Sequence, residues 1–337
     1  MDQLSAHLDR GWDLAQRGDA PGAIACAKRA LEIDPQSPEV HNLLGYTAAL
    51  NGEAEEALEH YRQAIALDDT YFEAMLNAIE VLLHPLGEWE EAIEMCDDAY
   101  ELAETPEEHA DSILLKVEAL IALGRTDDAL AAMARIPDKP FENASYTFLI
   151  GRSYFELGKI EKAAPYIEES AQRDPYSADA QYYLGLVRDE RGDLRGATEA
   201  LLRSRGLDAQ RPPPPWSPSP DTFASMVRGI LGRLDPALAR YVRGADVFVV
   251  DLPGPEIVVD GVDPRALLLL EQGPPSAEGE QGPLRLFVYQ RNVERIAGSL
   301  EVMEEEAAGA LAREIASFFL EREASTPAPD SKKRELN

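Results

Sequence analysis

Cysteine is almost absent from this sequence of 337 residues, which contains only Cys26 and Cys96. Both lie in helix-like hydrophobic patterns, at places where a small buried side chain fits. Such positions favour reduced structural thiols over disulfide or metal chemistry. The sequence therefore predicts neither a disulfide nor a cysteine metal site.

Long hydrophobic runs are also missing. No stretch of about 18 consecutive apolar residues occurs, so no membrane-spanning helix is predicted. The first residues, Met1-Asp2-Gln3-Leu4, lack the basic region and apolar stretch of a signal peptide. We therefore expect a cytoplasmic protein with no membrane partner.

Basic residues are scarce: 32 lysines and arginines face 62 aspartates and glutamates, which gives a formal net charge of -30. An anionic surface of this strength repels phosphate backbones and anionic lipids, so nucleic acid is not an expected partner. A protein or peptide partner of basic character is the natural complement. The alternative is that the charge serves solubility alone.

Small residues recur with a period of 34, and a repeat of this length is typical of helical-hairpin arrays. The recurrences include Gly11 with Gly45, Gly18 with Gly52, Ala23 with Ala57, Gly151 with Gly185, Gly158 with Gly192 and Ala163 with Ala197. The earlier glycine of a hairpin, such as Gly45, permits the two helices to cross closely. The later glycine, such as Gly52, permits a turn with a positive φ.

Leu44-Gly45, Gly52, Ala57, Tyr61 and Ala64 together resemble the tetratricopeptide repeat (TPR) family. The resemblance implies an all-α solenoid of about six hairpins over residues 4–210. The expected hairpins span 4–37, 38–71, 72–104, 106–137, 144–177 and 178–210, and the third and fourth are degenerate. Extra residues occur around His84-Pro85-Leu86, and the array is expected to bend or loosen near 137–140.

In this family the first helix of each hairpin lines a concave groove that holds a partner segment. The resemblance places nine side chains on that face, namely Leu8, Trp12, Asn42, Tyr46, Phe148, Arg152, Phe155, Tyr182 and Leu186. Exposed aromatic side chains are good anchors for a peptide. The alternative for each is an ordinary place in the core between repeats.

A proline-rich segment, 211–220, follows the repeats and is predicted to be a semi-rigid linker. Residues 221–323 then favour a small α+β domain. Helices are expected at 222–234, 236–242, 263–270 and 301–323, strands at 246–252 and 284–289, and a loop at 274–282. The tail, 324–337, has few apolar residues and is predicted to be disordered.

Four segments of this domain, 247–253, 263–273, 284–295 and 312–320, resemble the bacterial minimal zincin-like metallopeptidase family. In that family the last helix carries HExxH, whose two histidines bind zinc while the glutamate activates water. Here the aligned residues are Arg313-Glu314-Ile315-Ala316-Ser317, so both ligands are lost. The five histidines, His7, His41, His60, His84 and His109, all precede the domain.

The sequence thus predicts a protein-binding adaptor whose second domain is a pseudo-peptidase, with no catalytic residue, metal or cofactor. One alternative is an active metallopeptidase with atypical ligands, such as Glu314 and Glu323 or histidines from the repeats. Another is a dedicated chaperone or regulator of one client protein. The only trace of catalytic machinery is the degenerate motif at Arg313, Glu314 and Ser317.

Overall fold

A computed structural model describes residues 3–137, 141, 143–273 and 284–325. Contacts divide the chain into two compact units, Met1–Arg173 and Asp174–Asn337, called here the repeat unit and the C-terminal unit. The loop expected at 274–282, most of the predicted tail and positions 138–140 of the predicted bend lie outside the described residues.

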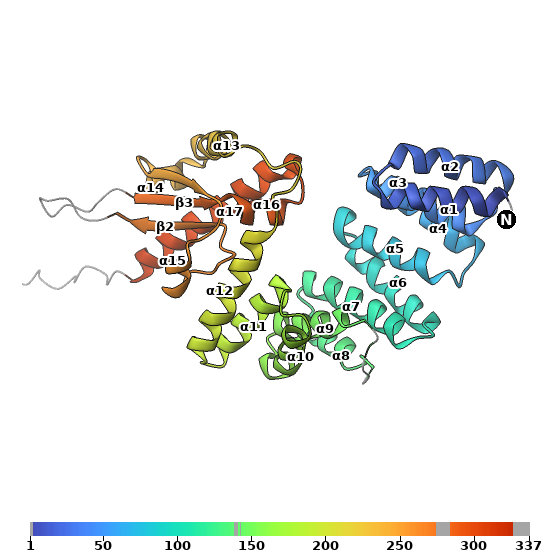
Figure 1. Cartoon of the computed structure of the whole chain (residues 1–337), viewed down its shortest axis with the longest axis horizontal. Coiled ribbons are helices and arrows are strands. Elements are labelled where there is room, and N and C mark those ends of the chain that lie inside the picture. The colour runs from blue at the N-terminus through green and yellow to red at the C-terminus, as the bar shows by residue number, and fades with distance from the viewer. Residues whose placement is uncertain (1–2, 138–140, 142, 274–283, 326–337) are drawn as a thin grey trace, which may run out of the picture. The chain divides into compact units, whose positions relative to one another are not determined.

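The repeat unit consists of antiparallel helical hairpins, drawn from blue to green in Figure 1. Its helices are α1 (Gln3–Gln16), α2 (Ala20–Ile33), α3 (Pro38–Leu50), α4 (Ala54–Leu67), α5 (Phe72–Val81), α6 (Trp89–Leu102), α7 (Pro106–Ala122), α8 (Thr126–Met133), α9 (Ser145–Glu156) and α10 (Ile160–Arg173). Each hairpin packs on the next, and the first helices α1, α3, α5, α7 and α9 contact one another in succession. The predicted hairpin periodicity is confirmed.

The second hairpin shows why glycine recurs in the pattern. A Cβ atom on Gly45 would lie 2.6 Å from the ring of Tyr61, whose side chain is almost fully buried between α3 and α4. The turn between these helices contains Gly52 with a φ of +78°. Both positions therefore require a residue without a side chain, for different reasons.

The third hairpin departs from the pattern at the end of its first helix. Residues Leu82–Leu86 form a short π-helix, η1, that contains Pro85 and ends at Gly87 with a φ of +68°. Proline cannot donate a backbone hydrogen bond, and a widened turn accommodates the extra residues without breaking the hairpin. The extra residues at His84-Pro85-Leu86 are thus accommodated within η1.

The N-terminus of α7 is closed by a capping box. Glu108 N donates to Thr105 Oγ1 at 3.1 Å, and Thr105 N donates to the Glu108 carboxylate at 3.0 Å. The backbone N–H of Glu104, which donates to the same carboxylate at 2.7 Å, is the main cause that holds the pKa of Glu108 below its usual value, and the bonds with Thr105 add to it. We expect Thr105→Ala to lower the free energy of unfolding by about 1 kcal/mol. Urea denaturation followed by circular dichroism measures this, and a change below the error would contradict the cap's role.

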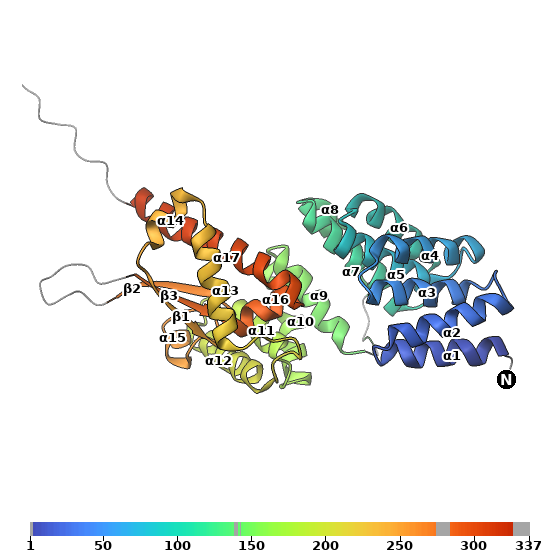
Figure 2. The same ribbon diagram turned by 90° about the horizontal axis from the view of Figure 1, so that it is seen from above.

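The C-terminal unit begins with one more hairpin and continues into a small sheet covered by helices (Figure 2). Its elements are α11 (Ala178–Glu190), α12 (Leu194–Gln210), α13 (Pro220–Arg233), α14 (Pro236–Val242), β1 (Asp246–Val250), α15 (Pro255–Val259), β2 (Leu268–Gln272), β3 (Leu284–Tyr289), α16 (Gln290–Ala297) and α17 (Leu300–Ser325). The strand order is β1-β3-β2, with β1 parallel and β2 antiparallel to β3.

One core holds this sheet to α13 and α17. Phe223 of α13, Leu286 of β3 and Ile315 of α17 are fully buried in it. Trp216, from the proline-rich segment, packs against the same core, and Gln290 donates to the Pro218 carbonyl at 2.8 Å. The segment after α12 is therefore fastened to the C-terminal unit.

The helix predicted at 263–270 is wrong. Residues 263–267 form a turn, and the leucine run that follows belongs to β2, where Leu268 faces Val288 and Leu270 faces Leu286. Leucine favours helices locally, but pairing with β3 buries two of the four leucines and outweighs that preference. The strands predicted at 246–252 and 284–289 and the helices predicted at 222–234, 236–242 and 301–323 are confirmed.

Candidate functional site

The repeat unit has a hollow of about 400 Å³ on the face formed by its first helices. Its lining comes from α5, η1, α7 and α9 and comprises Leu76, Glu80, His84, Asp111, Leu114, Leu115, Val117, Glu118, Ile121, Leu149, Arg152, Ser153 and Glu156. We call it the α5–α7–α9 hollow. It lies in three consecutive hairpins, including the two whose sequences are degenerate.

Helical spacing places these side chains on one face. On α7, Asp111, Leu115 and Glu118 follow one another at intervals of four and three residues, so they lie in one row along the helix. The leucines at the floor, Leu76, Leu114 and Leu115, are only partly buried and pack on the core between the hairpins. The hollow thus has an apolar floor.

Its rim is acidic. Four carboxylates, those of Glu80, Asp111, Glu118 and Glu156, face one guanidinium and one imidazole. Arg152 Nε donates to Glu156 at 2.7 Å, which neutralises one of the four carboxylates. His84 lies 3.9 Å from Glu118. A basic side chain that enters the hollow therefore meets uncompensated negative charge.

Asp111 is the most enclosed of these carboxylates. Burial raises the pKa of Asp111, while the hydroxyl of Tyr146, which donates to its Oδ1 at 2.7 Å, opposes the rise. Burial, and then the hydrogen bond to Asp111, raise the pKa of Tyr146. Tyr146 comes from α9 and Asp111 from α7, so the bond also fixes the spacing of the two helices that border the hollow.

Of the partner-binding residues expected from the sequence, Arg152 lies in the hollow. Phe148 and Phe155 are half-buried on the same helix, α9, and are not part of the lining. Trp12 and Tyr46 lie at the other end of the repeat unit, half-buried, with ring centroids 5.2 Å apart. The structure therefore does not bring the predicted residues together in a single site.

Asn42 differs from its expected role. It is fully buried, donates to the Tyr71 hydroxyl at 3.1 Å and accepts from Asn77 Nδ2 at 3.0 Å. The amide joins the second hairpin to the third, because a buried amide must have its hydrogen bonds satisfied. Its contribution is to the spacing of the hairpins and not to an open groove surface.

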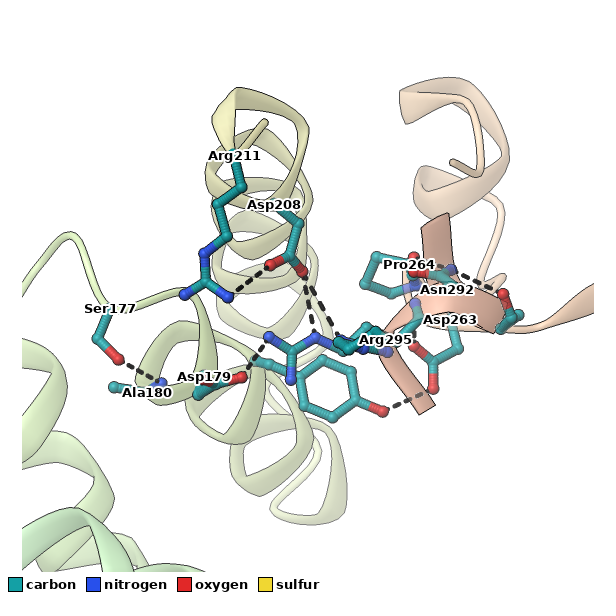
Figure 3. A network of polar contacts seen from close by, with 12 residues as sticks. Ser177, Asp179, Ala180, Asp208, Arg211, Asp263, Pro264, Asn292 and Arg295 are labelled. Atoms are coloured by element: carbon teal, nitrogen blue, oxygen red, sulfur yellow. Dashed lines mark hydrogen bonds and ion pairs between the residues drawn. The ribbon is translucent and has the colours of Figure 1, made fainter. Parts of the chain in front are cut away.

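Tyr182, on α11 of the C-terminal unit, is already engaged by this chain. Its hydroxyl donates at 2.7 Å to Oδ2 of Asp263, which is labelled in Figure 3. The Arg265 guanidinium lies 4.4 Å from the centroid of the Tyr182 ring. Burial, and then the neighbouring Asp263 carboxylate, raise the pKa of Tyr182. The expected groove position is thus covered by the turn that precedes β2.

Arg265 is the centre of this arrangement. Its side chain is only 9% exposed; it pairs with Asp179 at 2.6 Å and donates from Nε to Asp208 at 3.2 Å. Asp179 belongs to α11 and Asp208 to α12, and Figure 3 labels both. The network therefore holds the last hairpin to the β-sheet region within the C-terminal unit.

The three residues that the sequence resemblance suggests as a degenerate metallopeptidase motif lie on α17. Arg313, Glu314 and Ser317 are all exposed. Arg313 and Ser317 offer a guanidinium and a hydroxyl in place of imidazoles, and no histidine occurs in the chain after His109. These residues do not fit a zinc ion.

No helix in the described ranges is long and apolar enough to cross a lipid bilayer. The described architecture is that of a helical-hairpin repeat protein with an appended α+β region.

Comparison with known proteins assigns the repeats to a family. Two family models described as tetratricopeptide repeat match residues 8–72 and 148–212 and residues 86–147, together more than half of the chain. The chain belongs to the tetratricopeptide repeat family, as the sequence pattern predicts. Repeats of this family mediate protein–protein interactions.

Individual relatives are similar over the repeats. The chain is 26% identical over 198 residues to cellulose synthase 2 operon protein C of Komagataeibacter xylinus, covering 59% of this chain and 14% of that protein. It is 34% identical over 62 residues to the TPR repeat-containing protein PA0015 of Pseudomonas aeruginosa, covering 18% of this chain and 59% of that protein. The chain therefore spans from about a seventh to about three fifths of these relatives.

Among solved structures, PilF of Pseudomonas aeruginosa aligns with a TM-score of 0.53 and 20% identity, over 62% of this chain and 93% of that chain. At this identity the likeness concerns the fold alone.

The residues of the hollow on α5 and α7 were not identified from the sequence. The repeating glycines identify the regular hairpins, whereas α5 and α7 carry Ala78 and Val117 in place of glycine. The sequence does contain a signal for them: carboxylates and leucines alternate along one face of α5 and of α7.

Proposed function

We propose that the chain is a protein-binding adaptor whose α5–α7–α9 hollow holds a partner segment rich in lysine or arginine and aliphatic residues. The observation that carries this proposal is the combination of an apolar floor with four carboxylates around it. Aliphatic side chains of the partner bury against the leucines and supply affinity. Its basic side chains lie against the acidic rim, where charge complementarity adds specificity and speeds association.

The proposed site differs from the groove expected from the sequence in its position. It uses Arg152 but lies mainly in the third and fourth hairpins, away from Trp12 and Tyr46. Those two aromatics form a separate half-exposed pair at the first hairpins and extend the candidate surface for a longer partner. A cytoplasmic location for the complex remains part of the proposal.

We further propose that residues 221–323 form an inactive, zincin-like binding module, joined to the repeats by 211–220. The arginine and serine in place of the two histidines support the loss of chemistry. Elemental analysis of the purified chain after dialysis is expected to find far less than one zinc per chain. A ratio near one, retained against a weak chelator, would favour the metallopeptidase alternative.

The hollow can be tested without knowing the natural partner. A display library of random peptides is selected against the full chain, and the selected sequences are expected to be enriched in lysine or arginine alternating with aliphatic residues. Glu80→Lys with Glu118→Lys is expected to weaken binding of a selected peptide about tenfold or more, because two attractive charges become repulsive. Fluorescence anisotropy with a labelled peptide measures the dissociation constant.

A matched control separates the hollow from the general acidity of the chain. Glu55→Lys with Glu94→Lys changes the net charge equally, but these exposed residues lie on the second helices α4 and α6. This variant is expected to bind nearly as the wild type does, apart from a small effect that added salt removes. Equal weakening by both pairs would show that charge acts nonspecifically and would contradict the proposed site.

A further inference from the structure

A second hollow, of about 310 Å³, lies wholly within the C-terminal unit and has an unusual charge for this chain. Three arginines contribute to its lining, Arg211, Arg291 and Arg295, and Trp216 forms part of its wall. We call it the arginine hollow. Two carboxylates also line it, so three positive charges face two negative ones in a chain of net charge -30.

Both carboxylates are already engaged. Asp208 accepts from Arg265 at 3.2 Å and lies 3.8 Å from Arg211 (Figure 3). Glu294 is buried, and its Oε1 accepts from Ser217 Oγ at 2.6 Å and from Gln290 Nε2 at 2.8 Å. The charge of Asp208 is therefore directed to neighbouring arginines, whereas only one oxygen of Glu294 is hydrogen-bonded and its buried Oε2 has no hydrogen-bond partner among the described residues.

The three arginines differ in how far their donors are used. Arg291 donates to the carbonyls of Ala209 and Arg211. Arg295 has only an ion pair with Asp208 at 3.9 Å, which is too long for a hydrogen bond, and makes no hydrogen bond within the described part of the chain. Its side chain is 32% exposed, so it remains accessible from the hollow.

The carboxylates near Arg295, those of Asp208 and Asp179, compensate its charge only in part. Burial, and then the like charge of Arg265, lower the pKa of Arg295. A guanidinium in this situation gains from an anion that accepts two parallel hydrogen bonds.

We propose that the arginine hollow binds a small oxyanion, a phosphate or carboxylate group, with Arg295 as the principal donor and Arg211 beside it. The volume admits a small molecule that carries such a group and packs an apolar part against Trp216. This site is separate from the α5–α7–α9 hollow and does not depend on the function proposed there. Binding of a small ligand there would change how firmly the last hairpin is held to the sheet region.

The test uses the full chain with Trp12→Phe and Trp89→Phe, which leaves Trp216 as the only tryptophan. Its fluorescence is followed during titration with inorganic phosphate and, separately, with succinate, at ionic strength held constant with sodium chloride. A saturable change with either anion is expected, and the anion that produces it identifies the source of the oxyanion. A response to neither anion would overturn the proposal.

Variants locate the site. Arg295→Gln is expected to weaken binding about tenfold or more, since a charged hydrogen-bond donor is lost. Arg195→Gln is the control, because that side chain is 91% exposed on α12 and pairs with Glu199. Should Arg295→Gln lose its circular dichroism spectrum, Arg211→Gln decides. That residue is 54% exposed, and a severalfold loss of affinity is expected; unchanged affinity in the folded variant would overturn the proposal.

Discussion

Replacing Arg265 with leucine is expected to lower the free energy of unfolding of the C-terminal unit by about 3 kcal/mol. The substitution leaves two aspartates without their principal partner, and Asp208 is itself buried. It also removes the guanidinium from the face of the Tyr182 ring. Urea denaturation measures the loss, with Trp216 as the reporter in a chain that carries Trp12→Phe and Trp89→Phe.

Two further variants separate burial from charge. Arg265→Lys keeps the positive charge but cannot span both carboxylates with a planar fork, so an intermediate loss is expected. Arg195→Ala removes an exposed partner of Glu199 and is expected to cost about 0.5 kcal/mol or less. A loss for Arg265→Leu no larger than that of Arg195→Ala would show that the network does not hold the last hairpin to the sheet region.

Replacing Tyr61 with alanine is expected to destabilise the repeat unit by about 3 to 5 kcal/mol, because it empties the space beside Gly45. The ring is 2% exposed and is among the largest fully buried side chains in the described chain. Tyr61→Phe keeps the ring and is expected to change stability by less than about 1 kcal/mol.

Thermal unfolding followed by circular dichroism compares the two Tyr61 variants, with Trp12 fluorescence as a local probe of the first hairpins. Similar losses for alanine and phenylalanine would assign the effect to the hydroxyl. That result would contradict the explanation that the ring of Tyr61 packs in the space left by Gly45.

The hairpins of the repeat unit and the hairpin that begins the C-terminal unit were predictable because their causes are local. Gly18, Gly52, Gly124, Gly158 and Gly192 all have positive φ at the turns where the sequence pattern places them. Strand β3 was also predicted with its bounds, since its apolar run is short and rich in residues that favour strands. Helices α15 and α16 were not predicted separately, because each is short and follows a strand closely.

The contacts that decide the candidate sites are not local, and for that reason the sequence did not reveal them. Tyr182 and Asp263 are 81 residues apart, and Arg205 donates to the Pro253 carbonyl across 48 residues. The run Leu267–Leu270 was predicted as helix because nothing local indicates its partner strand. Pairing with β3 determines its conformation and turns Asp263 and Arg265 toward the last hairpin.

The α5–α7–α9 hollow depends on both kinds of information. The acidic character of the chain and the position of Arg152 were evident from the sequence. The convergence of Glu80, Asp111 and Glu118 depends on how three hairpins stack, and a single sequence does not specify that stacking.

Hydrogen–deuterium exchange of the full chain, with and without a selected basic peptide at saturation, tests the central claim most directly. Slower amide exchange is expected in α5, α7 and α9, with little change in α4 and α6 beyond a small global stabilisation. Protection confined to the first hairpins or to the β-sheet region, with none in α5, α7 and α9, would contradict the assignment of the partner site to this hollow.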